Sequence, residues 1–161
     1  MNKEQLIESA RRLGATTAAA TADYEARREA MAAELSRRML ARPDLDRLIG
    51  PDNREMLENN SRNMFRFMGS LFLNFEPVVL AETALWVFRA YRAHGFQLSY
   101  WPANLDTAVQ ILREQLAPES FASVYPFFEW LIVHNPAFAE LSDAALAQGP
   151  GGTPDAAPSH G

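Results

Sequence analysis

The sequence predicts an all-α domain, and three observations lead to that prediction. Apolar residues recur at steps of three and four along most of the chain, which is the spacing of amphipathic helices. No segment alternates apolar and polar residues for long enough to suggest a strand. Prolines and glycines separate the periodic segments, at the places where helices begin and end.

Two helices are expected in the N-terminal part. Apolar residues at helical spacing predict the first over residues 2–13. Residues 15–20 are small and read as a connector, after which Thr21 or Asp23 is expected to cap the second helix. That helix should stop at Arg42, because a proline follows and disfavours helical geometry in the residue before it.

The centre of the chain predicts one short helix and two long ones. Residues 44–49 form the short helix, which Gly50 terminates. The longest helix, over 52–75, is apolar on nearly all sides and is therefore expected to cross the middle of the domain. Pro77 begins the next helix and Gly95 ends it.

Prolines also divide the C-terminal part. Pro102 and Pro118 are expected to begin two further helices. Pro126 should kink the second of these and Pro136 should break it, leaving only a final turn near Phe138.

Length and composition limit the function. The 161 residues suit one domain, over 1–146, followed by a tail at 147–161 whose glycines and prolines predict disorder. The absence of cysteine excludes disulfides, thiolate metal sites and cysteine nucleophiles. The net charge of −5 disfavours nucleic-acid binding.

The sequence also argues against a membrane protein and against an enzyme. It has no apolar leader, and its most hydrophobic stretch, 64–80, is interrupted by polar residues, so a cytoplasmic protein with no membrane span is expected. No nucleophile elbow and no zinc-protease motif occurs. We therefore expect a non-catalytic protein.

The order of the expected helices resembles that of a globin, and two segments resemble the phycobiliprotein lineage. These are 59–68, with the sequence NNSRNMFRFM, and 91–95, with YRAHG. The resemblance covers roughly 52–116 and implies a globin-like, phycobiliprotein-like helical domain with extra N-terminal helices. Since those helices pair subunits in phycobiliproteins, it also implies a homodimer formed through 2–13 and 21–42.

Departures from the family concern the pigment. When Arg66 is aligned with the family's arginine, Leu57 stands where the bilin-attaching cysteine would be. Asn59 and Asn60 stand where an Arg-Asp pair holds the bilin propionate and pyrrole nitrogens. The resemblance therefore implies no covalent bilin, and the chain is similar to bilin biosynthesis-associated globins and to non-haem globin sensor domains of stressosome proteins.

His94 is the candidate metal ligand. It stands near the end of its helix, as a proximal histidine does in haem globins, and an imidazole can ligate iron or cobalt. The alternative is that His94 approaches the last carbonyls of its helix and is partly solvated. His134 is expected to face solvent at a helix end, and His160 lies in the tail that is expected to be unstructured.

The resulting hypothesis is a tetrapyrrole bound non-covalently between the central helix and the helix that begins at Pro77, for carriage, sensing or regulation. The amides of the candidate site match those of a corrinoid, so cobalamin is favoured over haem, and haem over bilin. The candidate site residues are His94, Asn59, Asn60, Asn63, Phe67, Arg66, Tyr91 and Trp101. The competing hypothesis is a globin-like interaction or sensor module without a cofactor.

Aromatic residues supply the possible walls of this site. Nine of them would suit the faces of a flat macrocycle, although helical spacing alone would place most of them in the core. They are Phe65, Phe67, Phe72, Trp86, Phe88, Tyr91, Phe96, Tyr100 and Trp101.

Overall fold

The computed structural model describes residues 1–147, with side chains to residue 144, and this part of the chain forms eight helices. They are α1 (Lys3–Arg11), α2 (Ala18–Leu40), α3 (Leu45–Ile49), α4 (Arg54–Leu73), α5 (Pro77–Ala93), α6 (Tyr100–Gln115), α7 (Pro118–Val133) and α8 (Asn135–Ala147). No strand occurs between residues 1 and 147, so the all-α prediction is confirmed. The expected tail at 147–161 lies outside the described residues, except for Ala147, which ends α8.

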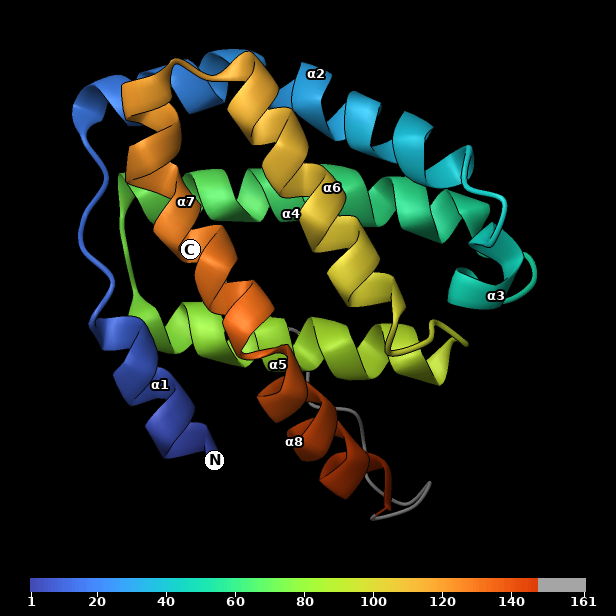
Figure 1. The fold of residues 1–161 in the computed structure, drawn as a ribbon. Coiled ribbons are helices and arrows are strands. Elements are labelled where there is room, and N and C mark those ends of the chain that lie inside the picture. Colours follow the sequence, from blue (N-terminus) through green and yellow to red (C-terminus); the bar gives the residue numbers. More distant parts are fainter. Residues whose placement is uncertain (148–161) are drawn as a thin grey trace.

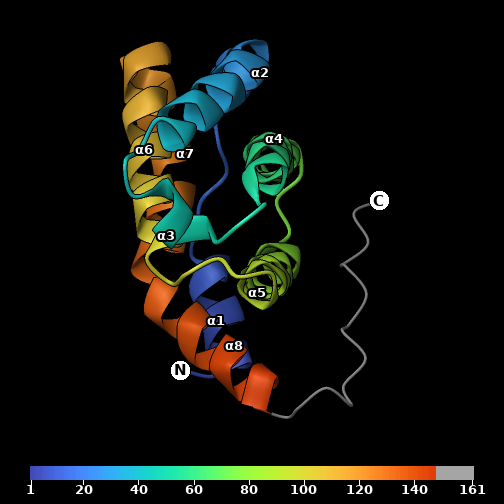
Figure 2. The same cartoon turned by 90° about the vertical axis from the view of Figure 1, so that its right-hand side faces the viewer.

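The helices are arranged on two sides of the core. In Figure 1, α2, α4 and α5 run nearly parallel, and α6, α7 and α8 cross them obliquely. Figure 2 views α4 and α5 almost end on along one side of the molecule, with α6 and α7 along the other, α2 at the top and α8 running across the bottom. Close packing joins α2 to α4, α6 and α7, and joins α5 to α1 and α8.

The second helix begins earlier than predicted. Its N-cap is Thr17, whose hydroxyl accepts a hydrogen bond from the N–H of Ala20 at 3.1 Å, and neither Thr21 nor Asp23 caps it. Thr21 is buried inside the helix and donates to the carbonyl of Thr17 at 3.0 Å. The small residues taken for a connector include a run of alanines, which are the best helix formers, so the helix starts as soon as a capping residue precedes them.

The prolines agree with the prediction in part. Pro77 and Pro118 are the first residues of their helices, as expected. Pro102 is the third residue of α6, and α7 continues as a helix through Pro126. The helix breaks near Pro136 as predicted, since α7 ends at Val133, but the predicted final turn is wrong, because α8 has 13 residues. Pro136 is the second residue of α8, where its missing N–H has no helical partner to lose.

A corner joins the ends of α3 and α5. Gly50 and Gly95 have φ of 76° and 106°, which favours glycine at both positions. The side-chain amide of Asn53 donates to the carbonyl of Ile49 at 2.7 Å and to that of His94 at 2.8 Å. A Cβ atom at Gly50 would lie 3.2 Å from the carbonyl oxygen of Gly95, so the two loops approach closely.

The core is anchored where α2 packs on α4. Tyr24 is fully buried, and its hydroxyl donates to the carbonyl of Phe65 at 2.7 Å. Its ring stacks on Phe65 at 6.0 Å and meets Phe72 edge-on at 4.9 Å. Gly69 permits this approach, because a Cβ atom there would lie 3.3 Å from the Tyr24 ring.

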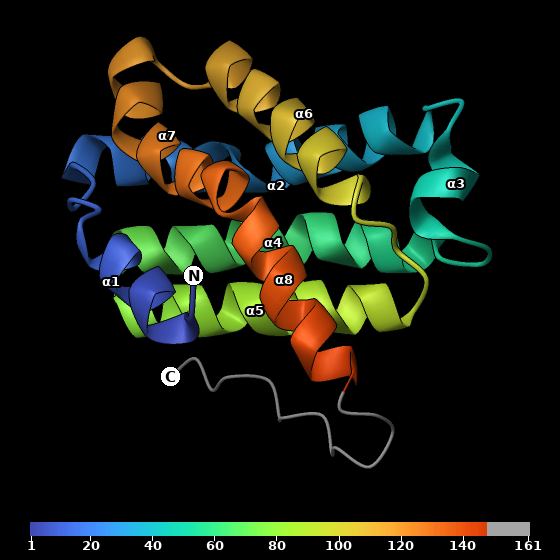
Figure 3. The same cartoon turned by 60° about the horizontal axis from the view of Figure 1, so that its bottom comes forward.

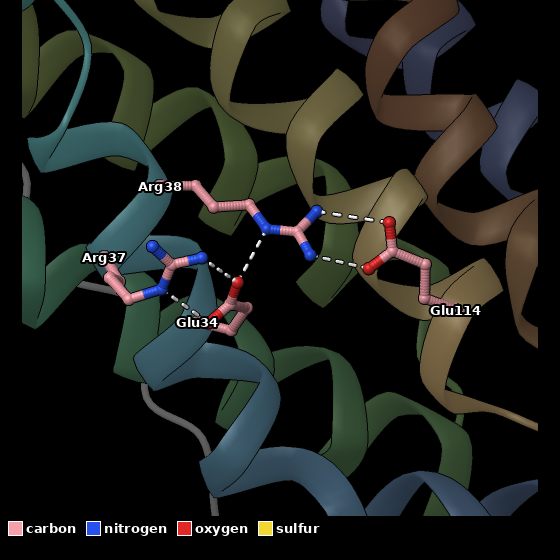
Figure 4. A network of polar contacts seen from close by, with 4 residues as sticks. All are labelled: Glu34, Arg37, Arg38 and Glu114. Carbon is pink, nitrogen blue, oxygen red and sulfur yellow. Dashed lines mark hydrogen bonds and ion pairs between the residues drawn. The ribbon is translucent and has the colours of Figure 1, made fainter.

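An ion-pair network ties α2 to α6 (Figure 4). Glu34 accepts hydrogen bonds from Arg37, at 2.6 and 2.9 Å, and from Arg38 at 2.8 Å. Arg38 also reaches across to Glu114 on α6, with a shortest distance of 2.6 Å. The bonds from Arg37 and Arg38 lower the pKa of Glu34 to about 2.

This network predicts a stability loss in acid. A carboxyl group with a lowered pKa in the folded state stabilises the fold above its unfolded pKa, and that contribution disappears as pH falls through about 2. We expect Glu34→Gln to be less stable than wild type at pH 6, with the difference shrinking at pH 2.5. Urea unfolding of both proteins at the two pH values measures it, and an equal difference at both would contradict the role of Glu34.

The apolar faces of the two N-terminal helices are used inside the chain. Leu6 and Ala10 of α1 are buried, and α1 packs on α5. Met31, Leu35 and Met39 of α2 are buried in the same core. The expected homodimer through these helices stays a prediction, and it would have to use their polar outer faces. Among the described residues, no helix is both long and apolar enough to cross a membrane.

Candidate functional site

A cavity of about 430 Å³ lies between α4 and α5, and we call it the slot. These two helices are consecutive and nearly parallel in space, yet each packs closely on other helices rather than on its neighbour. α8 crosses α5, as Figure 3 shows. Residues of α8 line the inner side of the slot. The size falls within the range of about 300–1,000 Å³ typical of small-molecule sites.

The lining of the slot is mainly apolar, with a few polar groups. α4 and α5 form its two long walls, and residues of α6, α7 and α8 close its inner side. The lining residues are Asn60, Asn63, Met64, Arg66, Phe67, Met68 and Ser70 of α4, Thr83, Ala84, Trp86, Val87, Phe88 and Tyr91 of α5, and Trp101, Leu105, Leu131, Asn135 and Phe138 of the inner side.

A rigid aromatic cluster forms one end of the slot. Trp101 stacks on Phe88 at 5.3 Å and meets Tyr91 edge-on at 5.7 Å. Tyr100, which is fully buried behind Trp101, meets it edge-on at 4.9 Å. Flat aromatic faces held in fixed positions suit the face of a planar ligand.

A buried polar group lies behind the slot wall. The Asn60 amide donates to the hydroxyl oxygen of Tyr100 at 2.9 Å, and the Asn104 amide donates to the same oxygen at 3.1 Å. Burial raises the pKa of Tyr100, so its hydroxyl stays neutral at physiological pH. The side chain of Asn60, which lines the slot, is therefore held in place by the hydroxyl of Tyr100.

Two lining residues carry polar atoms without a partner. The indole N–H of Trp101 and the side-chain oxygen of Asn135 are buried, and neither has a hydrogen-bond partner within the described chain. A buried polar group without a partner costs about 1–3 kcal/mol. A bound molecule or an ordered water that satisfied either atom would recover part of that cost.

The rim of the slot is polar and open to solvent. Asn63, Arg66 and Ser70 of α4 are all exposed and stand one turn apart along the helix. Ser70 donates to the carbonyl of Phe67 at 2.6 Å, which leaves Asn63 and Arg66 as the polar side chains at this edge. A ligand would therefore present an apolar body to the interior and any polar edge to the rim.

Six of the eight predicted site residues line the slot. They are Asn60, Asn63, Arg66, Phe67, Tyr91 and Trp101. Asn59 does not line it, since its side chain is exposed and accepts a hydrogen bond from Arg62. Of the nine aromatic residues considered as walls, the five that line the slot are Phe67, Trp86, Phe88, Tyr91 and Trp101.

His94 does not line the slot either. It is the C-cap of α5, is exposed, and its ring Nδ1 lies 2.9 Å from the carbonyl oxygen of Ala90, so Nδ1 carries the proton and donates. Its own carbonyl accepts from Asn53 in the corner described above. The structure thus places His94 at the last carbonyls of its helix, which is the alternative considered from the sequence, and no described cluster of His, Asp or Glu could hold a metal ion.

Several lining residues were not anticipated from the sequence. Ala84 and Thr83 leave room between the two helices, and Asn135 and Phe138 reach the slot from α8. The sequence did carry a signal for Ala84, because it is a small residue at helical spacing between the large residues Leu80 and Phe88. No signal pointed to the α8 residues, because that segment was expected to be a single turn.

Comparisons with known proteins add no relative. No family model matches the chain, and no curated protein and no solved structure matches it. The slot itself is therefore the feature that indicates a function.

Proposed function

We propose that this protein binds a planar, mainly apolar small molecule of the tetrapyrrole class, non-covalently, in the slot between α4 and α5. The observation that supports this most is a cavity of about 430 Å³ between two consecutive helices that do not pack on each other. Its position agrees with the place that the globin-like helix order implies for a tetrapyrrole. The role would be carriage, sensing or regulation, without turnover.

The chemistry of the slot favours a flat ring over a bulky polar one. Phe67 and Trp86 come from opposite walls, and Trp101 closes one end. A corrinoid carries amide arms around its ring, which need polar partners on several sides, whereas most of this lining is apolar. The order expected from the sequence, with cobalamin first, therefore changes to a flat porphyrin-like ring first.

Axial ligation by His94 is not part of this proposal. No described histidine lines the slot, and His94 is held outside it by its contacts to Ala90 and Asn53. Ligation through His94 would require the end of α5 to rearrange. A ring without a histidine-bound metal fits the residues as they stand.

The test is co-elution with candidate ligands. The purified protein is mixed separately with protoporphyrin IX, haem, cobalamin and biliverdin, and each mixture is gel-filtered while absorbance is recorded. We expect protoporphyrin IX to co-elute at one molecule per chain. Absence of a coloured protein peak in all four mixtures would overturn the proposal and leave an interaction module without a cofactor.

The same experiment tests the metal question. If haem or cobalamin co-elutes, its spectrum is compared between wild type and His94→Ala. An unchanged spectrum supports binding without His94. A spectrum of histidine ligation that His94→Ala abolishes would contradict the position of His94 outside the slot, while tetrapyrrole binding would stand.

A further inference from the structure

A second cavity, of about 600 Å³, lies between α2 and α4, and we call it the arginine groove. Its charged lining residues are Arg28, Glu29 and Arg37 of α2 and Glu58, Arg62 and Arg66 of α4. Four arginines thus face two glutamates in a protein whose net charge is −5. Arginine side chains are therefore concentrated in this groove of an acidic protein.

The four arginines differ in how far their charge is neutralised. Arg37 is paired with Glu34, and Arg28 lies 3.7 Å from Glu25. Both of these arginines on α2 therefore have a carboxylate beside them.

The two arginines that α4 contributes to the groove form no ion pair within the described residues. Arg62 donates to the neutral side chain of Asn59, and Arg66 forms no ion pair within the described part of the chain. Glu58 stands one turn before Arg62, but no ion pair joins them among these residues. Two guanidinium groups without an ion pair among the described residues thus stand four residues apart on one helix, a spacing at which like charges repel.

Arg66 also connects the two cavities, since it lines both the slot and the arginine groove. Arg62 lines only the groove, and Asn63 lines only the slot. An acidic group attached to a molecule in the slot would meet Arg66 at the shared edge and Arg62 one turn away. This arrangement also gives a way to separate the two sites, because Arg62 can be changed without altering the slot lining.

We propose that the arginine groove binds an oxyanion, a carboxylate or a phosphate group, through Arg62 and Arg66. Guanidinium groups form paired, charge-assisted hydrogen bonds with such groups, and an anion between the two arginines would reverse their repulsion. The source of the oxyanion is either an acidic arm of the ligand in the slot, which rests on the proposed function, or a free anion, which does not.

Two measurements on three proteins test the groove. Wild type, Arg62→Gln and the control Arg113→Gln are titrated calorimetrically with inorganic pyrophosphate. Arg113 lies on α6 over the ring of Phe121 and lines neither cavity, so its substitution removes the same charge elsewhere. The same proteins are then titrated with protoporphyrin IX and with its dimethyl ester, which has the same ring but no free acid. Circular dichroism checks that the variants are folded.

We expect Arg62→Gln to weaken pyrophosphate binding, protoporphyrin IX binding, or both, by about tenfold, the loss expected for one charge-assisted contact. The ester should bind wild type and Arg62→Gln equally, and Arg113→Gln should behave as wild type. An effect on pyrophosphate alone identifies a free anion, and an effect on the porphyrin acid alone identifies the acidic arm.

The proposal is overturned if Arg62→Gln changes neither anion by more than about threefold, or if it weakens the acid and the ester alike. Equal binding of acid and ester to all three proteins, with no pyrophosphate bound, would refute oxyanion binding in the groove and leave the proposed function intact. If neither porphyrin binds any protein, the proposed function fails. The pyrophosphate titration alone then shows whether the groove binds an oxyanion.

Discussion

Replacing Ala84 by tryptophan should weaken the binding of protoporphyrin IX roughly tenfold to a hundredfold, because the ligand would have to enter a slot already occupied by an indole. Ala84 lies in the middle of α5, is half-buried and lines the slot. The new side chain enters open space between α4 and α5, so the domain should still fold. Equilibrium titration of wild type and Ala84→Trp by absorbance measures the loss.

The matched control is Ala93→Trp. Ala93 is the last residue of the same helix, is exposed and does not line the slot, so this variant should bind as wild type does. If Ala84→Trp fails to fold, Ala84→Leu makes a smaller change at the same place and should give an intermediate loss. Unchanged binding in a folded Ala84→Trp protein would show that the ligand does not occupy the slot.

Tyr24→Ala should lower the free energy of unfolding by about 3–5 kcal/mol, the usual cost of truncating a large buried aromatic side chain. Tyr24 is fully buried between Phe65 and Phe72, at the contact of α2 with α4. Since small domains have only about 5–15 kcal/mol in total, this is a large fraction of their stability. Urea unfolding followed by circular dichroism measures it.

Tyr24→Phe separates the ring from the hydroxyl. It keeps the aromatic packing and removes only the hydrogen bond to the carbonyl of Phe65, so a loss of about 1 kcal/mol is expected. A loss below about 1 kcal/mol for Tyr24→Ala would mean that the contact of α2 with α4 does not anchor the fold.

The sequence predicts most of the helices because their ends carry local signals. Pro77 and Pro118 begin helices, and Gly50 and Gly95 adopt the positive φ that follows a helix end. The start of α2 was misplaced because Thr21 and Asp23 were taken as the candidate caps, whereas the alanines before them already belong to the helix and Thr17 caps it. The start and the end of a helix are set within a few residues, by helix propensity and by capping.

The C-terminal helix and the position of His94 needed three-dimensional information. Pro136 reads as a breaker, yet it is equally suited to the first turn of a new helix, and the packing of α8 on α5 selects the second outcome. His94 has the spacing of a ligand, but its side chain turns back to its own helix at Ala90, and Asn53 holds the backbone there. The position of a residue at the end of a helix does not specify whether its side chain points into a cavity or back toward the helix.

Part of the slot could be predicted from the sequence, because several of its residues lie on one helix. Asn60, Asn63 and Phe67 stand at helical spacing on one side of α4, so a single helix places them together. Asn135 reaches the same slot from a helix more than 60 residues away in the chain, a distance at which periodicity carries no information.

The most direct test of the slot as a ligand site is a titration of the wild-type protein with protoporphyrin IX, followed by tryptophan fluorescence. Trp86 and Trp101 line the slot, so a porphyrin bound there should quench the emission. We predict saturable quenching that ends at one porphyrin per chain and that requires roughly tenfold to a hundredfold more porphyrin in Ala84→Trp. Emission that stays unchanged, or that falls without saturation and equally in Ala84→Trp, would contradict the proposal that the slot between α4 and α5 binds a planar ring.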